Sequence, residues 1–429
     1  MSGSLKLRYP GVDDLGAMAA ALVAKRPDLL RLRELGASRA GRPLWLLSAG
    51  RGARHVLTVA GAHANEPVGG ASCLRLAEAF ASGESPALEE LDCTWHFLLC
   101  LDPDGMLLGS GWPGAGSGGS PVPSLLRYHQ GFYRPLFARQ PEFLPGAGDA
   151  RPLLPESEIL LGLLDELRPA VQFSLHGIEV GGSFLEMTHQ VPGVADAYRG
   201  VAAELDVPLE YRPFDGVDWG VDSPGVLVLP GDEVTQERDP SGSSTRVTWL
   251  EPLRYGTVSA VVEAPMWAVA GVSDSRPALL RPQDELLRVS ELLMERVKQV
   301  AELATPEPGE QSPAQALFHE AAWELLDVAP GVVSTWEECG LRGDGTSGFG
   351  ATRGNCVSLG IAARRVPLRA AAMMRQAAAG KRETTALDDL VAAWRRELAE
   401  YCTPRWVPVD VQTRLHTRTM LEIARLLLT

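Results

Sequence analysis

The sequence lacks the long apolar segments and the basic excess that mark membrane proteins and nucleic-acid-binding proteins. Its first ten residues contain no apolar run of signal-peptide length. No stretch of the 429 residues approaches 18 uninterrupted apolar positions, so we expect no transmembrane helix. Acidic residues outnumber basic ones by 54 to 40, which gives a net charge of −14 and argues against nucleic acid or an anionic membrane as the partner. We therefore expect a cytoplasmic protein.

The six cysteines include no C-x-x-C pair, which excludes the commonest cysteine-based metal and redox motifs. In a chain of this size without a signal segment, we expect reduced and mostly buried thiols. The hydrophobic fraction of 45% and the charged fraction of 22% are ordinary for a soluble globular enzyme. The length allows one large domain with an appendage, or two to three ordinary domains.

Short apolar runs that alternate with helical segments predict an α/β fold with a mostly parallel sheet. Buried strands are expected at residues 55–60, 94–101, 170–175 and 257–262. Three of these strands lead into residues that can bind metal or carry protons: His63 with Glu66, His176, and Glu263. Because ligands usually bind at the carboxyl ends of strands in such sheets, we expect these side chains to meet at one edge.

The pattern becomes helical from about residue 280. Amphipathic spacing predicts helices at residues 283–304, 317–328, 367–379 and 387–401. We therefore expect a catalytic domain over residues 1–280 and a mainly helical C-terminal region over residues 281–429.

His63, Glu66 and His176 have the composition of a catalytic zinc site. Two imidazoles and one carboxylate bind zinc and leave a fourth position open, and zinc then polarises a carbonyl group and acidifies a water molecule. Glu263 suits the role of a general acid/base that takes the proton of this water and passes it to a leaving amine. These residues also have interpretations without a function. A His-x-x-Glu pair is more often a chance pair on the surface, and a His-Gly after a strand is more often a turn.

Several motifs in a fixed order resemble those of the zinc carboxypeptidase family over roughly residues 9–275. The similar segments are the lead-in Leu35–Pro43 (LGASRAGRP), the first metal motif Gly61–Gly69 (GAHANEPVG), the turn Asp102–Gly105 (DPDG, for the family's Asn-Pro-Asp-Gly), the third-ligand segment Leu175–Gly177 (LHG) and the strand Thr257–Glu263. Several motifs in the right order are far more specific than any one of them alone.

The resemblance implies one Zn²⁺ ion bound by His63, Glu66 and His176, with Glu263 as the general base. It also implies an α/β fold with a central mixed eight-stranded sheet flanked by helices, to which the C-terminal helical region is appended. The implied activity is hydrolysis of a peptide or amide bond, first of all the removal of C-terminal residues. The substrate would then be a peptide or an acylated amino acid.

The sequence departs from the family at the substrate end of the site. The family usually has an Asp-x-Asn-Arg segment whose arginine binds the terminal carboxylate of the substrate, but no Asn-Arg occurs between residues 105 and 155. Arg127 and Arg134 are the candidates for this role or for oxyanion stabilisation, since the fork of arginine suits both. The family's substrate-side tyrosine has two candidates here, Tyr211 and Tyr255.

Two other functions stay open at this point. An amidohydrolase of the succinylglutamate desuccinylase/aspartoacylase type uses a similar His-x-x-Glu…His site on N-acyl amino acids, although the Asp-Pro-Asp-Gly turn and the Gly-Arg-Pro lead-in are closer to the peptidases. A binding protein with the same fold and no hydrolytic activity is the second alternative, and the presence of all four site residues argues against it. The sequence indicates neither the preferred side chain, nor the oligomeric state, nor the role of the helical region.

Overall fold

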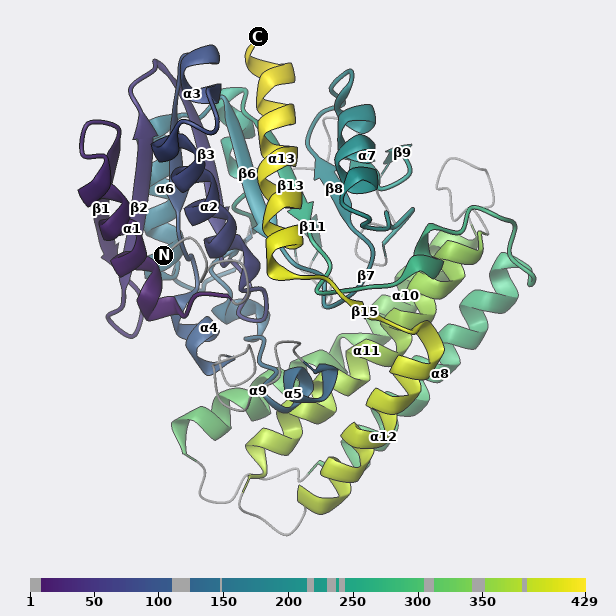
Figure 1. Ribbon diagram of the computed structural model, residues 1–429. Helices are drawn as coiled ribbons and strands as arrows, with labels where there is room; N and C mark the ends of the chain where they lie inside the picture. The colour runs from purple at the N-terminus through teal and green to yellow at the C-terminus, as the bar shows by residue number, and fades with distance from the viewer. Residues whose placement is uncertain are drawn as a thin grey trace.

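The computed structural model describes residues 9–429 apart from 110–123, 147–148, 214–219, 230–236, 239–243, 305–311, 342–351 and 380–383. A mixed sheet forms its centre (Figure 1). The nine strands lie in the order β1 (Leu30–Ala37), β2 (Pro43–Gly50), β4 (Cys93–Leu98), β3 (Arg54–Ala60), β6 (Val171–His176), β13 (Val258–Glu263), β8 (Phe184–Met187), β10 (Val226–Val228) and β9 (Gly220–Ser223).

The centre of this sheet is parallel and its flanks are mixed. Strands β4, β3, β6 and β13 run parallel to their neighbours in this series, whereas β1, β2 and β8 pair antiparallel. The predicted mixed α/β class is confirmed, but the sheet has nine strands and not eight. Its last two strands form a short antiparallel pair within residues 191–250, where the sequence has no readable period.

Helices cover both faces of the sheet (Figure 1). One face packs against α1 (Val12–Lys25), α2 (Val68–Ser82), α7 (Val194–Glu204) and α13 (Val409–Leu428), and the other against α6 (Pro155–Leu167). The adjacent residues Val56 and Leu57 illustrate the two layers, because Val56 belongs to the first hydrophobic core and Leu57 to the second. The near-continuous apolar strands of the sequence are explained by this burial on both sides.

Five further helices form a group beside the sheet: α8 (Pro282–Leu303), α9 (Pro313–Asp327), α10 (Ala329–Leu341), α11 (Arg353–Ala377) and α12 (Thr384–Cys402). Helix α11 lies at the centre of this group and is buried along most of its length. It continues through Pro367, so the prediction of a helix starting there was wrong. Proline lacks a backbone N–H and fits best in the first turn of a helix, which is why it was read as a start.

The last helix, α13, leaves this group and packs on the sheet between α2 and α7 (Figure 1). Its Leu415, Met420 and Ile423 lie in the same core as the central strands. The helical region expected over residues 281–429 thus occupies two places, and the division of the chain at residue 280 stays a prediction. The sequence did not reveal α13 as a helix because buried polar residues, such as Gln412 and Thr419, interrupt its apolar face.

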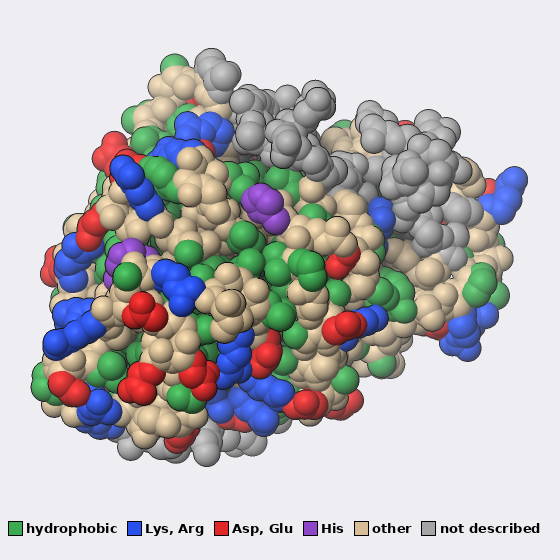
Figure 2. Space-filling model, turned by 90° about the horizontal axis from the view of Figure 1, so that it is seen from above, with side chains coloured by type: hydrophobic (Ala, Val, Ile, Leu, Met, Phe, Trp, Pro, Cys, Tyr) green, Lys and Arg blue, Asp and Glu red, His purple; other side chains and the backbone are tan. Residues whose placement is uncertain are grey.

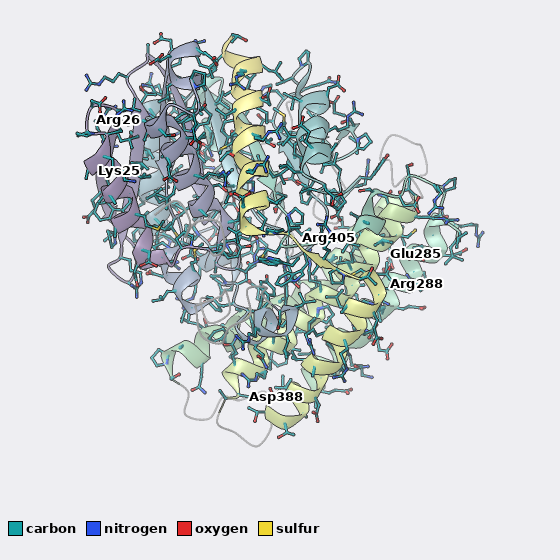
Figure 3. The ribbon with its side chains drawn as sticks, in the orientation of Figure 1. Lys25, Arg26, Glu285, Arg288, Asp388 and Arg405 are labelled. Carbon is teal, nitrogen blue, oxygen red and sulfur yellow. The ribbon has the colours of Figure 1, made fainter. Side chains whose placement is uncertain are left out.

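The link between the helical group and α13 is fixed to the α/β part by a small sheet. Strand β15 (Arg405–Trp406) pairs with β14 (Trp267–Ala268), which pairs with β7 (Val180–Gly181). Arg405, labelled at the junction in Figure 3, also donates to the backbone oxygen of Asp206 over 2.8 Å. Strands β7 and β14 lie a few residues after His176 and Glu263, so the helical group is attached directly beside the candidate site.

The expectations from composition concerned membrane-spanning helices and cysteines. None of their helices combines the length and the hydropathy needed to cross a bilayer. The five cysteines that are described are free thiols, and four of them are buried. Figure 2 shows acidic and basic side chains mixed over the face seen from above.

His96, in β4, makes the stability of the fold dependent on pH. The ring is buried, with Nδ1 2.9 Å from Ser48 Oγ and Nε2 3.0 Å from His55 Nδ1. Burial, together with the neighbouring His55, lowers the pKa of His96 to about 4 from its ordinary value of 6.5. Between these two values the unfolded chain binds a proton that the folded chain does not. The folded state is therefore favoured fully above pH 6.5. As the pH falls to about 4, the free energy of unfolding decreases by roughly 3 kcal/mol through this group.

We predict that His96→Gln flattens the pH dependence of stability. The free energy of unfolding, measured by urea denaturation at pH 7 and pH 5, should fall by about 2 kcal/mol less in the variant than in the wild type. His189→Gln is the control, because His189 is exposed, and it should keep the wild-type slope. Equal slopes in the wild type and in His96→Gln would contradict the assignment.

Candidate metal centre and active site

The end of strand β3 places His63 and Glu66 at the edge of the sheet. Gly61 follows the strand with a φ of +63°, and a Cβ atom at this position would lie 2.9 Å from Cys100 Sγ. Only glycine fits this turn without strain, because the left-handed region and the close contact both disfavour a side chain. The next residues form a short turn in which the Glu66 N–H donates to the His63 oxygen over 3.2 Å, and α2 begins directly afterwards.

The three predicted metal ligands converge with their donor atoms facing one another. His63 Nδ1 lies 3.0 Å from Glu66 Oε1 and 3.1 Å from His176 Nδ1, and His176 Nδ1 lies 3.0 Å from Glu66 Oε2. All three side chains are buried. Ligand atoms around a tetrahedral zinc ion are about 3.3 Å apart, given bonds near 2.0 Å. The donor set and its spacing therefore fit a zinc ion with little adjustment.

Glu142 lies behind the two histidines and was not identified from the sequence. Its carboxylate approaches His63 Nε2 to 2.7 Å and His176 Nε2 to 3.4 Å. The segment Glu142–Pro145 (EFLP) contains neither a histidine nor an Asn-Arg pair that would have pointed to it. The segment continues into the short strand β5 (Phe143–Leu144).

Two faces of the histidine pair offer acidic oxygens to a cation: the Nδ1 atoms face Glu66, and the Nε2 atoms face Glu142. Histidines that bind metal usually donate their second ring N–H to a carboxylate or another acceptor, which fixes the tautomer. The Nε2 atoms already have such acceptors, Glu142 and the Ser174 hydroxyl at 2.8 Å from His176. Arg134 lies 3.0 Å from His63 Nε2 and 3.6 Å from Glu66 Oε1, so its positive charge does not distinguish the two faces. The Nδ1 face with Glu66 is therefore the better metal site.

The buried charges of this centre stabilise one another. Burial alone would raise the pKa of Glu66 and of Glu142, but the positive charges of His63 and His176 outweigh it and hold the pKa of both carboxyls below the usual range. Burial likewise opposes a charged His176, yet Glu142 and Glu66 raise its pKa well above 6.5. A metal ion that binds here has to displace a proton, so its binding weakens as the pH falls.

Glu263 ends strand β13 directly beside His176, its partner in the parallel register of β6. The carboxylates of Glu263 and Glu66 and the ring of His176 offer ligand atoms that lie within 4.8 Å of one another. The backbone oxygen of Glu263 accepts a hydrogen bond from the Ser183 hydroxyl over 2.6 Å. The strand end is thus held in place, with its carboxylate close to Glu66 and His176.

Two of the sequence motifs, the lead-in and the Asp102–Gly105 turn, are joined by hydrogen bonds. The loop that contains Leu35–Pro43 contacts the Asp102–Gly105 turn through Ser38, whose hydroxyl donates to Asp104 over 2.9 Å. Arg39 donates to Asp102 over 3.1 Å, and Asp102 also accepts from the Gly105 N–H over 3.0 Å. These two motifs support the end of the sheet near the site and do not face the metal ligands.

Residues 15–112 match the zinc carboxypeptidase family model. The resemblance to the zinc carboxypeptidases is thereby confirmed over a segment that contains the lead-in, His63, Glu66 and the Asp102–Gly105 turn. The match supports a hydrolase of the metallopeptidase type. No curated protein sequence matches the chain significantly.

Solved structures that align with part of this chain include two carboxypeptidases. The metallo-carboxypeptidase from Burkholderia cenocepacia aligns with 59% of this chain and 60% of its own, at 17% identity and a TM-score of 0.37. The carboxypeptidase A from Helicoverpa armigera aligns with 60% of this chain and 65% of its own, at 15% identity and a TM-score of 0.38. The alignments span less than two thirds of either protein.

The structure separates the candidates for the substrate end of the zinc carboxypeptidase pattern. Arg134 lies at the metal centre, 3.0 Å from His63 Nε2 and 3.6 Å from Glu66 Oε1. Arg127 lies exposed on the short helix α5 (Leu125–Gln130). Tyr255 hydrogen-bonds Asp165 before the start of β13, at the opposite end of this strand from Glu263. Tyr211 follows Glu210, whose carboxylate accepts from the Gly182 N–H over 2.8 Å.

We predict that Glu142→Gln weakens zinc binding about 10- to 100-fold, as expected for loss of the carboxylate behind a metal-binding histidine. The dissociation constant would be measured by competition with a chromophoric chelator. Glu158→Gln, on the exposed side of α6, is the matched control and should bind zinc like the wild type. If the two variants bind equally well, Glu142 does not support the metal ligands.

Proposed function

We propose that this protein is a zinc-dependent carboxypeptidase that binds one Zn²⁺ ion and removes C-terminal residues from peptides. The observation that supports the proposal is the convergence of His63, Glu66 and His176, with Glu263 beside them in register. This arrangement has every part that hydrolysis of an amide bond requires: a three-ligand metal centre, a general base and a cationic group near the reacting carbonyl. We further propose a cytoplasmic location, in which neither nucleic acid nor a membrane is a partner.

Zinc, when bound, supplies a Lewis acid that polarises the scissile carbonyl and lowers the pKa of a water molecule. The two imidazoles and the Glu66 carboxylate would hold it. Glu142 and Ser174 keep the rings in the orientation that directs both Nδ1 atoms to the same point. The first task of the chain is therefore to hold this orientation before substrate arrives.

Glu263 performs the proton transfers. Its carboxylate accepts a proton from the attacking water while the water oxygen forms a bond to the carbonyl carbon. The same carboxyl group then gives this proton to the nitrogen of the leaving amino acid as the C–N bond breaks. The proton taken from water thus ends on the amine, and Glu263 returns to its ionised state.

Arg134 is placed to stabilise the negative charge that develops on the carbonyl oxygen. Its guanidinium is already at the centre, 3.6 Å from Glu66 Oε1, and its Nε donates to Gln140 over 3.2 Å. Donors that are fixed before the reaction are worth more than mobile ones, because no reorganisation is needed as the charge forms. Arg134 thus acts as the oxyanion stabiliser, and Arg127 stays a second candidate for contact with substrate.

We predict that Glu263→Gln binds zinc like the wild type and lowers kcat about 100- to 10,000-fold, the usual contribution of a general base. Zinc content would be measured by elemental analysis, and turnover with N-benzoylglycyl-phenylalanine. Glu291→Gln, exposed on α8, is the matched control and should keep full turnover. Unchanged kcat in Glu263→Gln would remove Glu263 from the mechanism.

The reaction class itself is tested by a substrate panel on the zinc-loaded protein. The panel contains peptides with a free C-terminal carboxylate, the same peptides as C-terminal amides, and N-acetyl amino acids. The proposal predicts hydrolysis of the free-carboxylate peptides first. Cleavage of N-acetyl amino acids alone would instead establish the amidohydrolase alternative, and a zinc-loaded protein that cleaves none of them would be a binding protein.

A further inference from the structure

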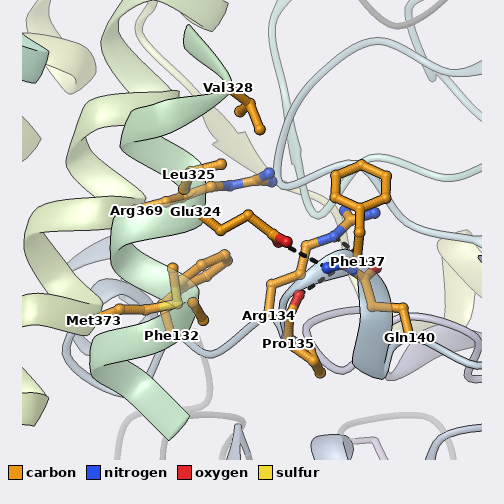
Figure 4. Close-up of a pocket in the computed structure, with 11 residues that line it drawn as sticks. Phe132, Arg134, Pro135, Phe137, Gln140, Glu324, Leu325, Val328, Arg369 and Met373 are labelled. Atoms are coloured by element: carbon orange, nitrogen blue, oxygen red, sulfur yellow. Dashed lines mark hydrogen bonds between the residues drawn. The ribbon is translucent and has the colours of Figure 1, made fainter. Parts of the chain in front are cut away.

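A pocket lies between the α/β part and the helical group, next to the metal centre. Its walls include Phe132, Arg134 and Phe137 from the segment after α5, Glu324 from α9, and Arg369 and Met373 from α11 (Figure 4). Arg134 belongs to both the pocket and the metal centre. A substrate at the metal centre can therefore extend past Arg134 into a space that the helical group closes.

Arg369 is held in this wall by a buried carboxylate. Its Nε donates to Glu179 over 2.8 Å, and the other Glu179 oxygen lies 2.9 Å from His129 Nε2. Glu179 and His129 are both fully buried, and Glu179 comes three residues after the metal ligand His176. The guanidinium also lies 5.1 Å from the ring centre of Phe132. These contacts fix Arg369 relative to the metal centre although it belongs to another part of the chain.

The two arginines approach the pocket from opposite walls. Figure 4 shows the guanidinium end of Arg369 extending from α11 towards Phe137, and that of Arg134 rising from the facing segment. Glu324 is the acidic residue among the lining residues, and its carboxylate accepts the Phe137 N–H over 2.7 Å. The described lining thus presents two guanidinium groups and one carboxylate, while Glu179 and Glu66, outside the lining, each contact one of the two arginines.

The size of the pocket fits a small anionic group. Its volume is about 40 Å³, which corresponds to roughly three water molecules, the size of a carboxylate group. Phe132, Phe137 and Met373 provide apolar walls, and a charge-assisted hydrogen bond is stronger where water is excluded. The planar fork of arginine matches both oxygens of a carboxylate at once.

We propose that Arg369 binds the free carboxylate of the substrate in this pocket, and that the helical group is thereby part of the substrate site. The proposal rests on the proposed carboxypeptidase function and names its specificity-determining residue. It explains how a chain without an Asn-Arg segment after the Asp102–Gly105 turn recognises a C-terminus. The preferred substrates are then molecules that carry a carboxylate one residue beyond the scissile bond, and their C-terminal amides are poor ligands.

The test is a comparison of equilibrium binding, measured by titration calorimetry on the full zinc-loaded chain with N-acetyl-phenylalanine and N-acetyl-phenylalaninamide. The wild type should bind the carboxylate at least about tenfold more tightly than the amide, because a hydrogen bond to a charged group contributes this much or more. Arg369→Gln should reduce this preference about tenfold. Arg375→Gln, one and a half turns further along α11, is the control and should keep it.

Removal of the Arg369 charge leaves the buried Glu179 with one cationic partner fewer, so folding is checked by thermal unfolding. The double variant Arg369→Met/Glu179→Gln removes both charges and should lose the preference as Arg369→Gln does. If neither variant folds, Arg369→Lys decides, because it keeps the charge without the fork and should lower the preference several-fold. An unchanged preference in a folded Arg369 variant overturns the proposal.

The outcome is separable from that of the proposed function, because it measures binding and not turnover. If the wild type cleaves free-carboxylate peptides and Arg369→Gln keeps the preference for the carboxylate ligand over the amide, the carboxypeptidase function stands and only the role of Arg369 is excluded. If the zinc-loaded protein cleaves no member of the substrate panel, the carboxypeptidase function is excluded, whatever ligand Arg369 binds.

Discussion

Two histidines are buried between two glutamates at the end of the sheet, and the electrostatics of this cluster determine how the site is built. Glu66 and Glu142 contact opposite nitrogens of His63 and His176, and none of the four side chains is exposed. Burying such charges is costly unless each has a partner with good geometry. The parallel strands β3 and β6 meet this requirement, because they place one histidine each at neighbouring strand ends. A cation between the Nδ1 atoms and Glu66 would add the remaining compensation.

The helical group is connected to this centre at three points that are close to it in sequence. Strand β7 comes shortly after His176, strand β14 comes shortly after Glu263, and Glu179, directly before β7, bonds Arg369 of α11. Because of these contacts, the helical group is fixed relative to the candidate catalytic residues and is not an independent appendage. The return of α13 to the sheet has the same consequence, since the chain that follows the helical group packs in the α/β core.

Much of the fold and most of the site can be predicted from the sequence, for identifiable reasons. Strands buried on both faces appear in the sequence as apolar runs. His63, His176 and Glu263 stand out because each is a polar residue that follows such a run. Glu142 and Arg369 could not be found this way, because their roles depend on contacts between distant segments. Helix α13 was missed because it buries polar side chains, and the first half of α11 because Pro367 resembles a helix start. Local patterns thus identify elements and ligands, whereas the partners behind the ligands come from tertiary packing.

The most direct test of this account is the position of the metal in a crystal of the protein, located by anomalous diffraction on both sides of the zinc absorption edge. We predict one zinc peak per chain, bonded at about 2.0 to 2.2 Å to the Nδ1 atoms of His63 and His176 and to the Glu66 carboxylate. A peak between the Nε2 atoms and Glu142 would contradict it. The absence of any zinc peak, in crystals grown with zinc in excess, would contradict it as well.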